Sequence, residues 1–294
     1  MDTLAEIEGI DIPEIKEFDI LEVMKDTHNF SCAVFGKRRM GKSILIKDLI
    51  HKTKSWFTEI YVFSQSSHLQ PDLYDYCPKY NIFNGFNEQK LIEIWNRQEA
   101  FIMGELKKGK KKKDLPIILV VFDDIIGDPK VRNSKIFNDL HILGRHLNFA
   151  SIVLSQEFGG RGGLPKVARA NEDLVISFFP NAEYDRKLII EQYLSTKTKK
   201  LGEAILRKVC MEEYQAIVVA NFKTDIEPSE YIYRFKARPK VPKFEIGGNK
   251  PLSHSQLNFL NAQTFGTAME NPQIHQDMTT RNRRGRSLFD RNDY

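Results

Sequence analysis

The sequence predicts an α/β protein with a mostly parallel central sheet flanked by helices on both faces. Two observations carry this prediction. Short apolar runs alternate with helical patterns from about residue 30 to about residue 212, as in chains built from strand–helix units. Several of these runs, such as the one at 116–122, are apolar throughout, which is typical of parallel strands buried on both faces. The 294 residues suffice for one such domain with a substantial core.

Each element follows from the local pattern. Strands are expected where apolar runs are bounded by polar or turn-forming residues, at 30–36, 59–64, 116–122, 150–156 and 173–179. Helices are expected where apolar residues recur at helical spacing, at 42–52, 90–108, 134–147, 183–194 and 199–212. Asn133 or Ser134 is the expected cap of the third helix. The last two runs, 214–222 and 230–238, alternate apolar and polar residues and predict exposed strands that pair as a terminal hairpin.

Composition divides the chain into three parts. An acidic N-terminal arm is predicted over 1–27, the α/β domain over 28–239, and an extended or disordered basic C-terminal tail over 240–294. The tail begins after Pro239, where proline, glycine and lysine replace the apolar runs and Asn, Gln and Arg then follow. Such a composition cannot bury enough apolar surface to form a core of its own.

Charge and cysteine content limit the class of protein. The net charge of +5 is compatible with nucleic acid but does not demand it. Three widely spaced cysteines, Cys32, Cys77 and Cys210, form no C-x-x-C pair, which argues against a disulfide framework or a zinc knuckle. The N-terminus does not resemble a secretory signal, and no run approaches the roughly 18 apolar residues of a membrane span. We expect a soluble, intracellular protein that does not associate with a membrane.

The segment "GKRRMGKS" fits the phosphate-binding pattern G-x-x-x-x-G-K-[ST]. It lies between an expected strand and an expected helix, as that pattern requires. Glycines allow the backbone N–H groups to surround a phosphate chain, and the helix adds its positive end. Lys42 is expected to contact the β- and γ-phosphates, and the Ser43 hydroxyl to ligate Mg²⁺. The alternative is a plain glycine turn. The predicted nucleotide-binding residues are Gly36, Lys37, Arg38, Arg39, Met40, Gly41, Lys42, Ser43 and Ile44.

Two adjacent carboxylates follow the apolar run "ILVVF". Asp123 ends the expected strand, which we place next to the phosphate-binding strand, where its carboxylate can hold the water shell of Mg²⁺. Asp124 is then placed to orient or deprotonate an attacking water, which hydrolysis requires and simple binding does not. The alternative is that Asp124 only begins the turn into "IIGDP".

A polar amide ends the next expected strand. Gln156 follows "SIVLS", and a strand tip beside the phosphate-binding loop places its side chain near the γ-phosphate or the attacking water. It is therefore predicted to report whether the triphosphate is intact. The alternative is a glutamine that only begins a loop.

Four segments in this order, "GKRRMGKS", "ILVVFDD", "LGRHLN" and "SIVLSQ", resemble the genome-packaging ATPases of the FtsK/HerA superfamily. Within this superfamily, the sequence resembles in particular the poxvirus-type packaging ATPases of large nucleocytoplasmic DNA viruses and their virophages. The segment "VFSQSSHLQPDLYDYCPK" is also similar to that family, and the resemblance covers about residues 28–235. It implies a RecA-like P-loop NTPase fold of the ASCE class.

The resemblance also implies site residues and partners. Lys42 and Ser43 would bind phosphate and metal, Asp123 the metal, Asp124 would be the catalytic carboxylate and Gln156 the sensor. ATP and Mg²⁺ are the implied ligands. The implied partners are double-stranded DNA, further copies in a ring of six or five, and a capsid or portal protein. The implied location is the viral factory in the host cytoplasm, or the virion. Many motors of this superfamily have Asp-Glu where this chain has Asp-Asp.

ATPases of this kind use an arginine to stabilise transition-state charge, often from a neighbouring subunit. Arg145 is favoured because it ends the helix that leads into the sensor strand. Arg38 and Arg39 in the phosphate-binding loop and Arg186 beyond the fifth strand are alternatives. For each of them, a solvated or structural ion pair is an equally economical role.

A lysine-rich segment, "KKGKKKK", precedes the third expected strand. Its charges repel one another, so a solvated loop is expected. In a ring, such a loop can line the pore and contact DNA phosphates without reading bases. Simple solubility is the alternative. The candidate DNA contacts are Lys107, Lys108, Lys110, Lys111, Lys112 and Lys113.

The sequence thus predicts a Mg²⁺-dependent ATPase that translocates double-stranded DNA into a viral capsid. One alternative is a related FtsK/HerA-type motor for DNA transfer or segregation. Another is a P-loop kinase of small molecules, against which the paired carboxylates and Gln156 argue. A third is a nucleotide-gated DNA- or capsid-binding scaffold with little turnover.

Overall fold

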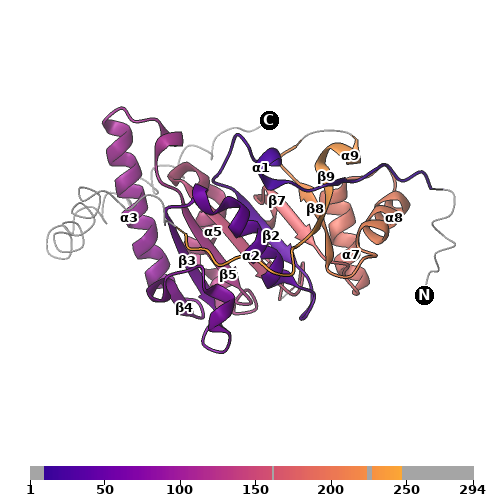
Figure 1. Cartoon of the computed structure of the whole chain (residues 1–294), viewed down its shortest axis with the longest axis horizontal. Coiled ribbons are helices and arrows are strands. Elements are labelled where there is room, and N and C mark those ends of the chain that lie inside the picture. Colours follow the sequence, from indigo (N-terminus) through magenta and orange to yellow (C-terminus); the bar gives the residue numbers. More distant parts are fainter. Residues whose placement is uncertain (1–9, 161, 224–226, 247–294) are drawn as a thin grey trace, which may run out of the picture. The chain divides into compact units, whose positions relative to one another are not determined.

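A sheet of nine strands organises the part of the chain that the computed structural model describes, residues 10–160, 162–223 and 227–246 (Figure 1). The spatial order is β1-β9-β8-β7-β2-β6-β5-β3-β4. The six strands from β7 to β4 run parallel, whereas β8 is antiparallel to both β7 and β9. The strands are β1 Lys16–Glu17, β2 Ser31–Phe35, β3 Glu59–Ser64, β4 Ile82–Asn84, β5 Ile118–Asp123, β6 Phe149–Ser155, β7 Leu174–Ser177, β8 Gln215–Ala220 and β9 Ile232–Lys236.

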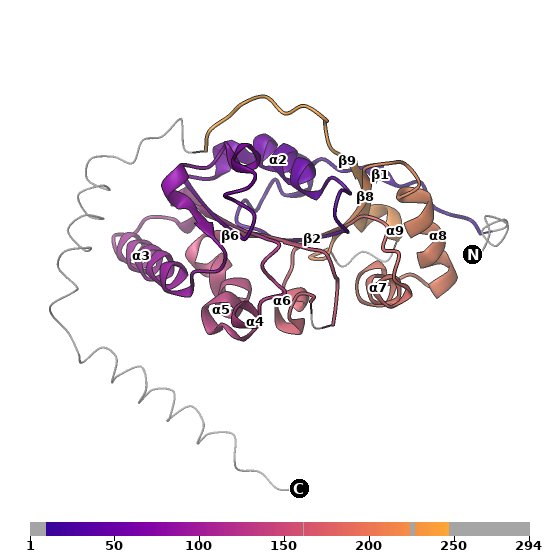
Figure 2. The same ribbon diagram turned by 90° about the horizontal axis from the view of Figure 1, so that it is seen from below.

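Helices cover both faces of this sheet. In Figure 2, α2 lies on one face, and α3, α5, α6 and α7 lie on the other. The predicted fold class is therefore confirmed. The α-helices are α1 Ile20–Val23, α2 Lys42–Thr53, α3 Glu88–Lys107, α4 Pro129–Asn133, α5 Lys135–Leu143, α6 Lys166–Ala170, α7 Glu183–Ile189, α8 Lys199–Val209 and α9 Pro228–Tyr231. A π-helical turn, Ile190–Leu194, continues α7.

The alternation of side chains along each strand gives the sheet two cores. On β2, Val34 packs in the core that contains α2, whereas Ala33 and Phe35 pack in the core of the opposite face. Both sets are buried, which explains why the strand reads as a continuous apolar run. The Ser134 hydroxyl accepts a hydrogen bond from the Phe137 N–H at the start of α5 and so confirms one of the two predicted caps.

The predicted exposure of the penultimate strand is wrong. Every residue of β8 is buried, because β8 lies between β7 and β9 and both of its faces contribute to the cores. The predicted antiparallel pairing of the last two strands is confirmed. They do not form a tight hairpin, since α9 lies between them in the chain.

Both ends of the described chain pack on the sheet domain. Residues Lys16 and Glu17 pair with β9, and Ile20 is buried in the core beside α2. Residues 237–246, here called the C-terminal strap, reach α2, where Arg238 forms an ion pair with the buried Asp48 at 2.6 Å. The predicted boundaries at residues 28 and 239 stay a prediction, and residues 247–294 of the predicted tail lie outside the described residues.

Candidate nucleotide-binding site

The predicted nucleotide and metal ligands converge with Asp124 and Gln156 at the carboxyl edge of the sheet, where β2, β5 and β6 end. The P-loop, residues 36–43, follows β2, and its first amide, Gly36 N–H, donates to the Ser155 carbonyl oxygen of β6 at 3.2 Å. The amide of Asp124, just after β5, donates to the Leu154 carbonyl oxygen of β6 at 3.4 Å. We expected the Asp123 strand next to the P-loop strand, but β6 lies between them. The sensor strand thus separates the phosphate-binding loop from the carboxylates.

Backbone geometry explains the two glycines of the P-loop. Gly41 has φ +91° and precedes the first residue of α2, in a region that side chains with a β-carbon rarely adopt. A β-carbon at Gly36 would lie 2.8 Å from the Cδ2 atom of the buried Phe178. The loop therefore turns directly into the N-terminus of a twelve-residue helix, a geometry that favours anions.

Lys42 lies inside the P-loop. Its ammonium group donates to the carbonyl oxygens of Gly36 and Lys37, the latter at 3.1 Å. Burial lowers the pKa of Lys42, and the nearby Asp123 and Asp124 charges oppose this shift. The cation is thus held within the loop that the motif assigns to a phosphate chain, with two carboxylates close enough to interact with it.

Asp123 is fixed by a tyrosine that the sequence analysis missed. The Asp123 side chain is buried, and burial raises its pKa. The Tyr74 hydroxyl donates to the Asp123 Oδ2 atom, which favours the charged carboxylate, and it lies 3.0 Å from the Ser64 Oγ atom. Ser64 and Asp123 are register partners on β3 and β5. Strand pairing accounts for the position of Ser64 beside Asp123. It does not account for Tyr74, which lies in the short 3₁₀ turn Pro71–Tyr74, and the strand pattern therefore gave no signal for it.

Asp124 lies at the site in an unusual conformation. Its φ of +55° is uncommon for a residue with a β-carbon, and its side chain is exposed at the carboxyl edge. The Gln156 Nε2 atom donates to its Oδ1 atom at 2.7 Å. The two residues, 32 positions apart, are therefore held together beside the P-loop, as an arrangement for positioning one reactant would require.

The donor set fits Mg²⁺ bound together with a nucleotide. Among the residues that the structure describes, no group of three or more His, Cys, Asp or Glu side chains could hold a metal. Mg²⁺ commonly takes one or two carboxylates plus substrate phosphates and waters. Asp123 and the Ser43 hydroxyl at the start of α2 supply oxygen ligands of the required type.

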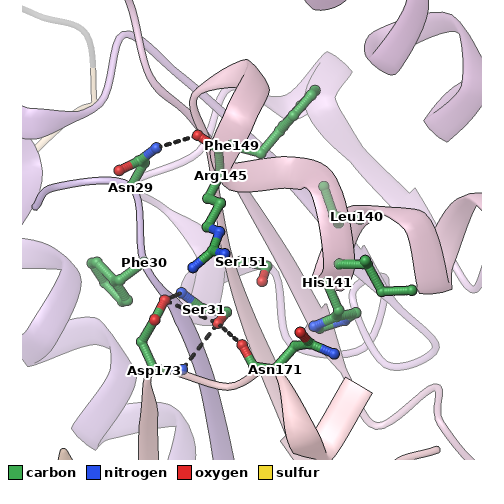
Figure 3. A pocket seen from close by; sticks show the side chains of 11 residues that line it. Asn29, Phe30, Ser31, Leu140, His141, Arg145, Phe149, Ser151, Asn171 and Asp173 are labelled. Carbon is green, nitrogen blue, oxygen red and sulfur yellow. Dashed lines mark hydrogen bonds between the residues drawn. The ribbon is translucent and has the colours of Figure 1, made fainter. Parts of the chain in front are cut away.

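Arg145 lies at the opposite, amino edge of the sheet. It belongs to the 3₁₀ turn Gly144–Leu147, and its carbonyl oxygen accepts a hydrogen bond from the Asn29 Nδ2 atom at 2.6 Å. Figure 3 shows its side chain extending toward Ser31 and Asp173. The seven residues of β6 span roughly 20 Å between this turn and the carboxyl edge. The structure therefore separates Arg145 from the P-loop of its own chain.

The other candidate arginines lie at the carboxyl edge. Arg186 donates to the carbonyl oxygens of Pro180 and Asn181 at 3.1 and 2.8 Å and lies 3.5 Å from a Glu203 carboxylate oxygen. These contacts restrain its guanidinium within its own chain. Arg38 and Arg39 are exposed on the P-loop. The assignment of the catalytic arginine stays a prediction.

The lysine-rich segment also lies at the amino edge, between the end of α3 and β5. Lys108 and Lys110 both form ion pairs with the Glu105 carboxylate, and these contacts lower the pKa of Glu105. Lys111 and Lys113 are exposed. The predicted solvated loop thus contains two exposed lysines that pair with Glu105, three further exposed lysines, Lys107, Lys111 and Lys113, and the half-buried Lys112.

Comparison with known proteins supports a P-loop fold. A family model described as Poxvirus A32 protein matches residues 15–222. The conjugation coupling protein TcpA of pCW3, solved with ATPγS, is 10% identical, with 77% of this chain and 70% of TcpA covered and a TM-score of 0.53. That similarity shows a shared fold. The genome packaging NTPase B204 from Sulfolobus turreted icosahedral virus 2, solved with AMPPCP, is 13% identical, with 72% of this chain and all of B204 covered and a TM-score of 0.46.

None of the curated proteins matches the chain. Within the described residues, no helix has the length and apolar character needed to cross a membrane.

Proposed function

The chain belongs to the Poxvirus A32 protein family, and we propose that it is an ATP-hydrolysing double-stranded DNA translocase that packages a viral genome into its capsid. The proposal includes a ring of six or five copies, a capsid or portal partner, and action at the viral factory or in the virion. The observation that carries the catalytic part is the 2.7 Å hydrogen bond between Gln156 and Asp124 beside the P-loop. A loop that only bound phosphate would not need a carboxylate held by an amide from the adjoining strand.

The residues of the carboxyl edge have different roles in the proposed reaction. The P-loop amides and Lys42 bind the triphosphate, and Ser43 and Asp123 would hold Mg²⁺, which would supply positive charge to neutralise the phosphates. Asp124 orients the attacking water and accepts its proton, and Gln156 positions Asp124. After hydrolysis, Asp124 and Gln156 no longer face a γ-phosphate. Because Gln156 directly follows β6, a movement of Gln156 also moves the end of that strand. Since β6 leads back to Arg145 at the amino edge, one strand connects the two edges.

Steady-state ATP hydrolysis with and without double-stranded DNA tests the proposal. The full chain should hydrolyse ATP in a Mg²⁺-dependent manner, and DNA should stimulate turnover. Asp124→Asn should abolish turnover but retain ATP binding, because the change removes the base and keeps the P-loop. Lys42→Ala should lose both. Lys79→Ala, an exposed lysine before β4, is the control and should behave as wild type.

Other outcomes favour the alternatives. ATP binding without turnover, with or without DNA, would favour a nucleotide-gated scaffold. A phosphorylated small-molecule product would favour a kinase. If Asp124→Asn hydrolysed ATP at the wild-type rate, the assignment of the base would be wrong.

A further inference from the structure

A strained, exposed tyrosine lies against the P-loop. Tyr214 is 50% exposed and has φ +63°, which is an outlier for a bulky side chain. A β-carbon built on Gly41 would lie 3.2 Å from the Tyr214 Cδ1 atom, so the ring rests on the last residue before α2. Its hydroxyl donates to the Glu213 carboxylate, and this hydrogen bond raises the pKa of the phenol. The turn before β8 thus holds an aromatic ring at the phosphate-binding loop.

Sheet topology places this ring on a defined side of the loop. Asp124 and Gln156, which would face the γ-phosphate, follow β5 and β6, on one side of β2. The triphosphate therefore runs from that side across the start of α2, and the nucleoside extends toward β7 and β8, on the other side. Because β8 is antiparallel to β7, it begins at the carboxyl edge, and Tyr214 directly precedes it.

The chemistry of the ring suits a nucleobase. An aromatic side chain can stack on any base, and such stacking contributes about 1–3 kcal/mol per base in nucleic-acid sites. Ile44, in the first turn of α2, is 46% exposed and offers a second apolar group near the same loop.

We propose that the Tyr214 ring forms one wall of the nucleobase site and stacks on the base of the bound nucleoside triphosphate, an inference that rests on the proposed function. Tyr214 is then a binding residue for the nucleoside, whereas Lys42 and Ser43 bind the phosphates. Tripolyphosphate has no base that could stack on the ring.

Calorimetric titration of the full chain with ATP and with inorganic tripolyphosphate, both with Mg²⁺, separates these contributions. Tyr214→Asn removes the ring, and asparagine tolerates the left-handed backbone better than most residues. We expect it to bind ATP about tenfold more weakly and tripolyphosphate as wild type does. Tyr214→Phe retains the ring face and should bind ATP within about twofold of wild type. Tyr80→Asn, at a tyrosine that is 80% exposed beside β4, is the matched control and should change neither affinity.

Each result decides between the two proposals. If wild type binds neither ligand, the proposed function fails. If wild type binds ATP and Tyr214→Asn binds it equally well, only the base-stacking inference is overturned. Equal losses for ATP and tripolyphosphate in Tyr214→Asn would also overturn it, because they would assign Tyr214 to the shape of the P-loop. If Tyr214→Asn does not fold, the Tyr214→Phe and Tyr214→Trp pair decides: a ring face is retained in both, so loss of ATP affinity in both would contradict stacking.

Discussion

The two edges of the sheet carry different kinds of polar side chain. At the carboxyl edge, side chains at the ends of β5 and β6 and in the turn Pro71–Tyr74 contact one another directly, as in the Gln156–Asp124 and Tyr74–Asp123 pairs. At the amino edge, Arg145 and the exposed Lys111 and Lys113 are displayed at the surface. From this difference between the two edges we infer that the carboxyl edge binds a nucleotide without help from another copy. The amino edge, in contrast, presents cations to partners. Substitutions at each edge can test whether the two edges have these separate roles.

The largest effect is expected at Arg145. If it stabilises transition-state charge at the P-loop of a neighbouring copy, Arg145→Ala should lower the ATP turnover of the assembled protein by about 10³-fold. ATP binding should not change, because the binding groups lie at the other edge. The measurement is turnover at saturating ATP and DNA, with ATP affinity measured on the same samples.

A mixing experiment separates action in trans from a folding defect. Lys42→Ala retains Arg145, and Arg145→Ala retains Lys42, so a mixed ring contains interfaces with both groups intact. Random mixing of equal amounts should restore about a quarter of the wild-type sites. Inactivity of the mixture, with assembly intact, would contradict a role for Arg145 across the interface and would favour Arg38, Arg39 or Arg186.

The sequence predicted the carboxyl edge better than the amino edge for a physical reason. Parallel strands must end at the same edge, so residues at strand tips, such as Asp123 and Gln156, can be brought together from the strand pattern alone. The strand order could not be derived, because periodicity does not encode which strands are neighbours; hence β6 was not placed between β2 and β5. Tyr74 and Tyr214 lie in irregular turns, where no period predicts the direction of a side chain.

A buried histidine–glutamate pair lies at the amino edge. His141 Nδ1 on α5 lies 2.9 Å from Glu172 Oε1, and both side chains are 0% exposed. Burial raises the pKa of Glu172, and the nearby His141 opposes the shift. Glu172→Ala leaves the buried histidine without its polar partner and should lower the free energy of unfolding by about 1–3 kcal/mol in urea titrations.

The double variant His141→Leu/Glu172→Met is the control, because it replaces both groups by apolar ones. It should be much closer to wild type than Glu172→Ala. The folded Glu172→Ala protein should still bind ATP normally, since the carboxyl edge is unaffected. Loss of ATP binding at a temperature where the protein is folded would show that the edges are not independent.

A smaller effect is expected from Tyr74→Phe at the carboxyl edge. The change removes one hydrogen bond to the buried Asp123 carboxylate, an interaction of about 1.5–3 kcal/mol. We expect the Mg²⁺ concentration for half-maximal hydrolysis to rise about tenfold, with Mg²⁺-free ATP binding unchanged. Tyr76→Phe, at another buried tyrosine of the same segment, should leave the Mg²⁺ dependence unchanged. An unaltered Mg²⁺ dependence in Tyr74→Phe would contradict this role of the Tyr74 hydroxyl and would leave Tyr74 only a role in packing.

The smallest effect is expected at the lysine-rich segment, and it tests whether charge at the amino edge contacts DNA. Lys108 and Lys110 are already paired with Glu105, so Lys111 and Lys113 are the informative pair. Each phosphate contact adds about 0.9 to the slope of log affinity against log salt. The Lys111→Ala/Lys113→Ala variant should therefore bind double-stranded DNA a few-fold more weakly, with a slope reduced by about two.

The control must remove the same charge elsewhere, because any loss of two lysines lowers the net charge and weakens DNA binding slightly. Lys200→Ala/Lys208→Ala meets this condition: both lysines are exposed on α8, beyond β7 and away from the lysine-rich segment. Equal slopes for the two double variants would mean that DNA senses only the total charge. A reduced slope confined to Lys111→Ala/Lys113→Ala would assign the contact to the amino edge. Burial lowers the pKa of Lys112, and the charge of Arg145 at the same edge lowers it further. DNA bound there would therefore lie near the residue predicted to reach the next ATP site.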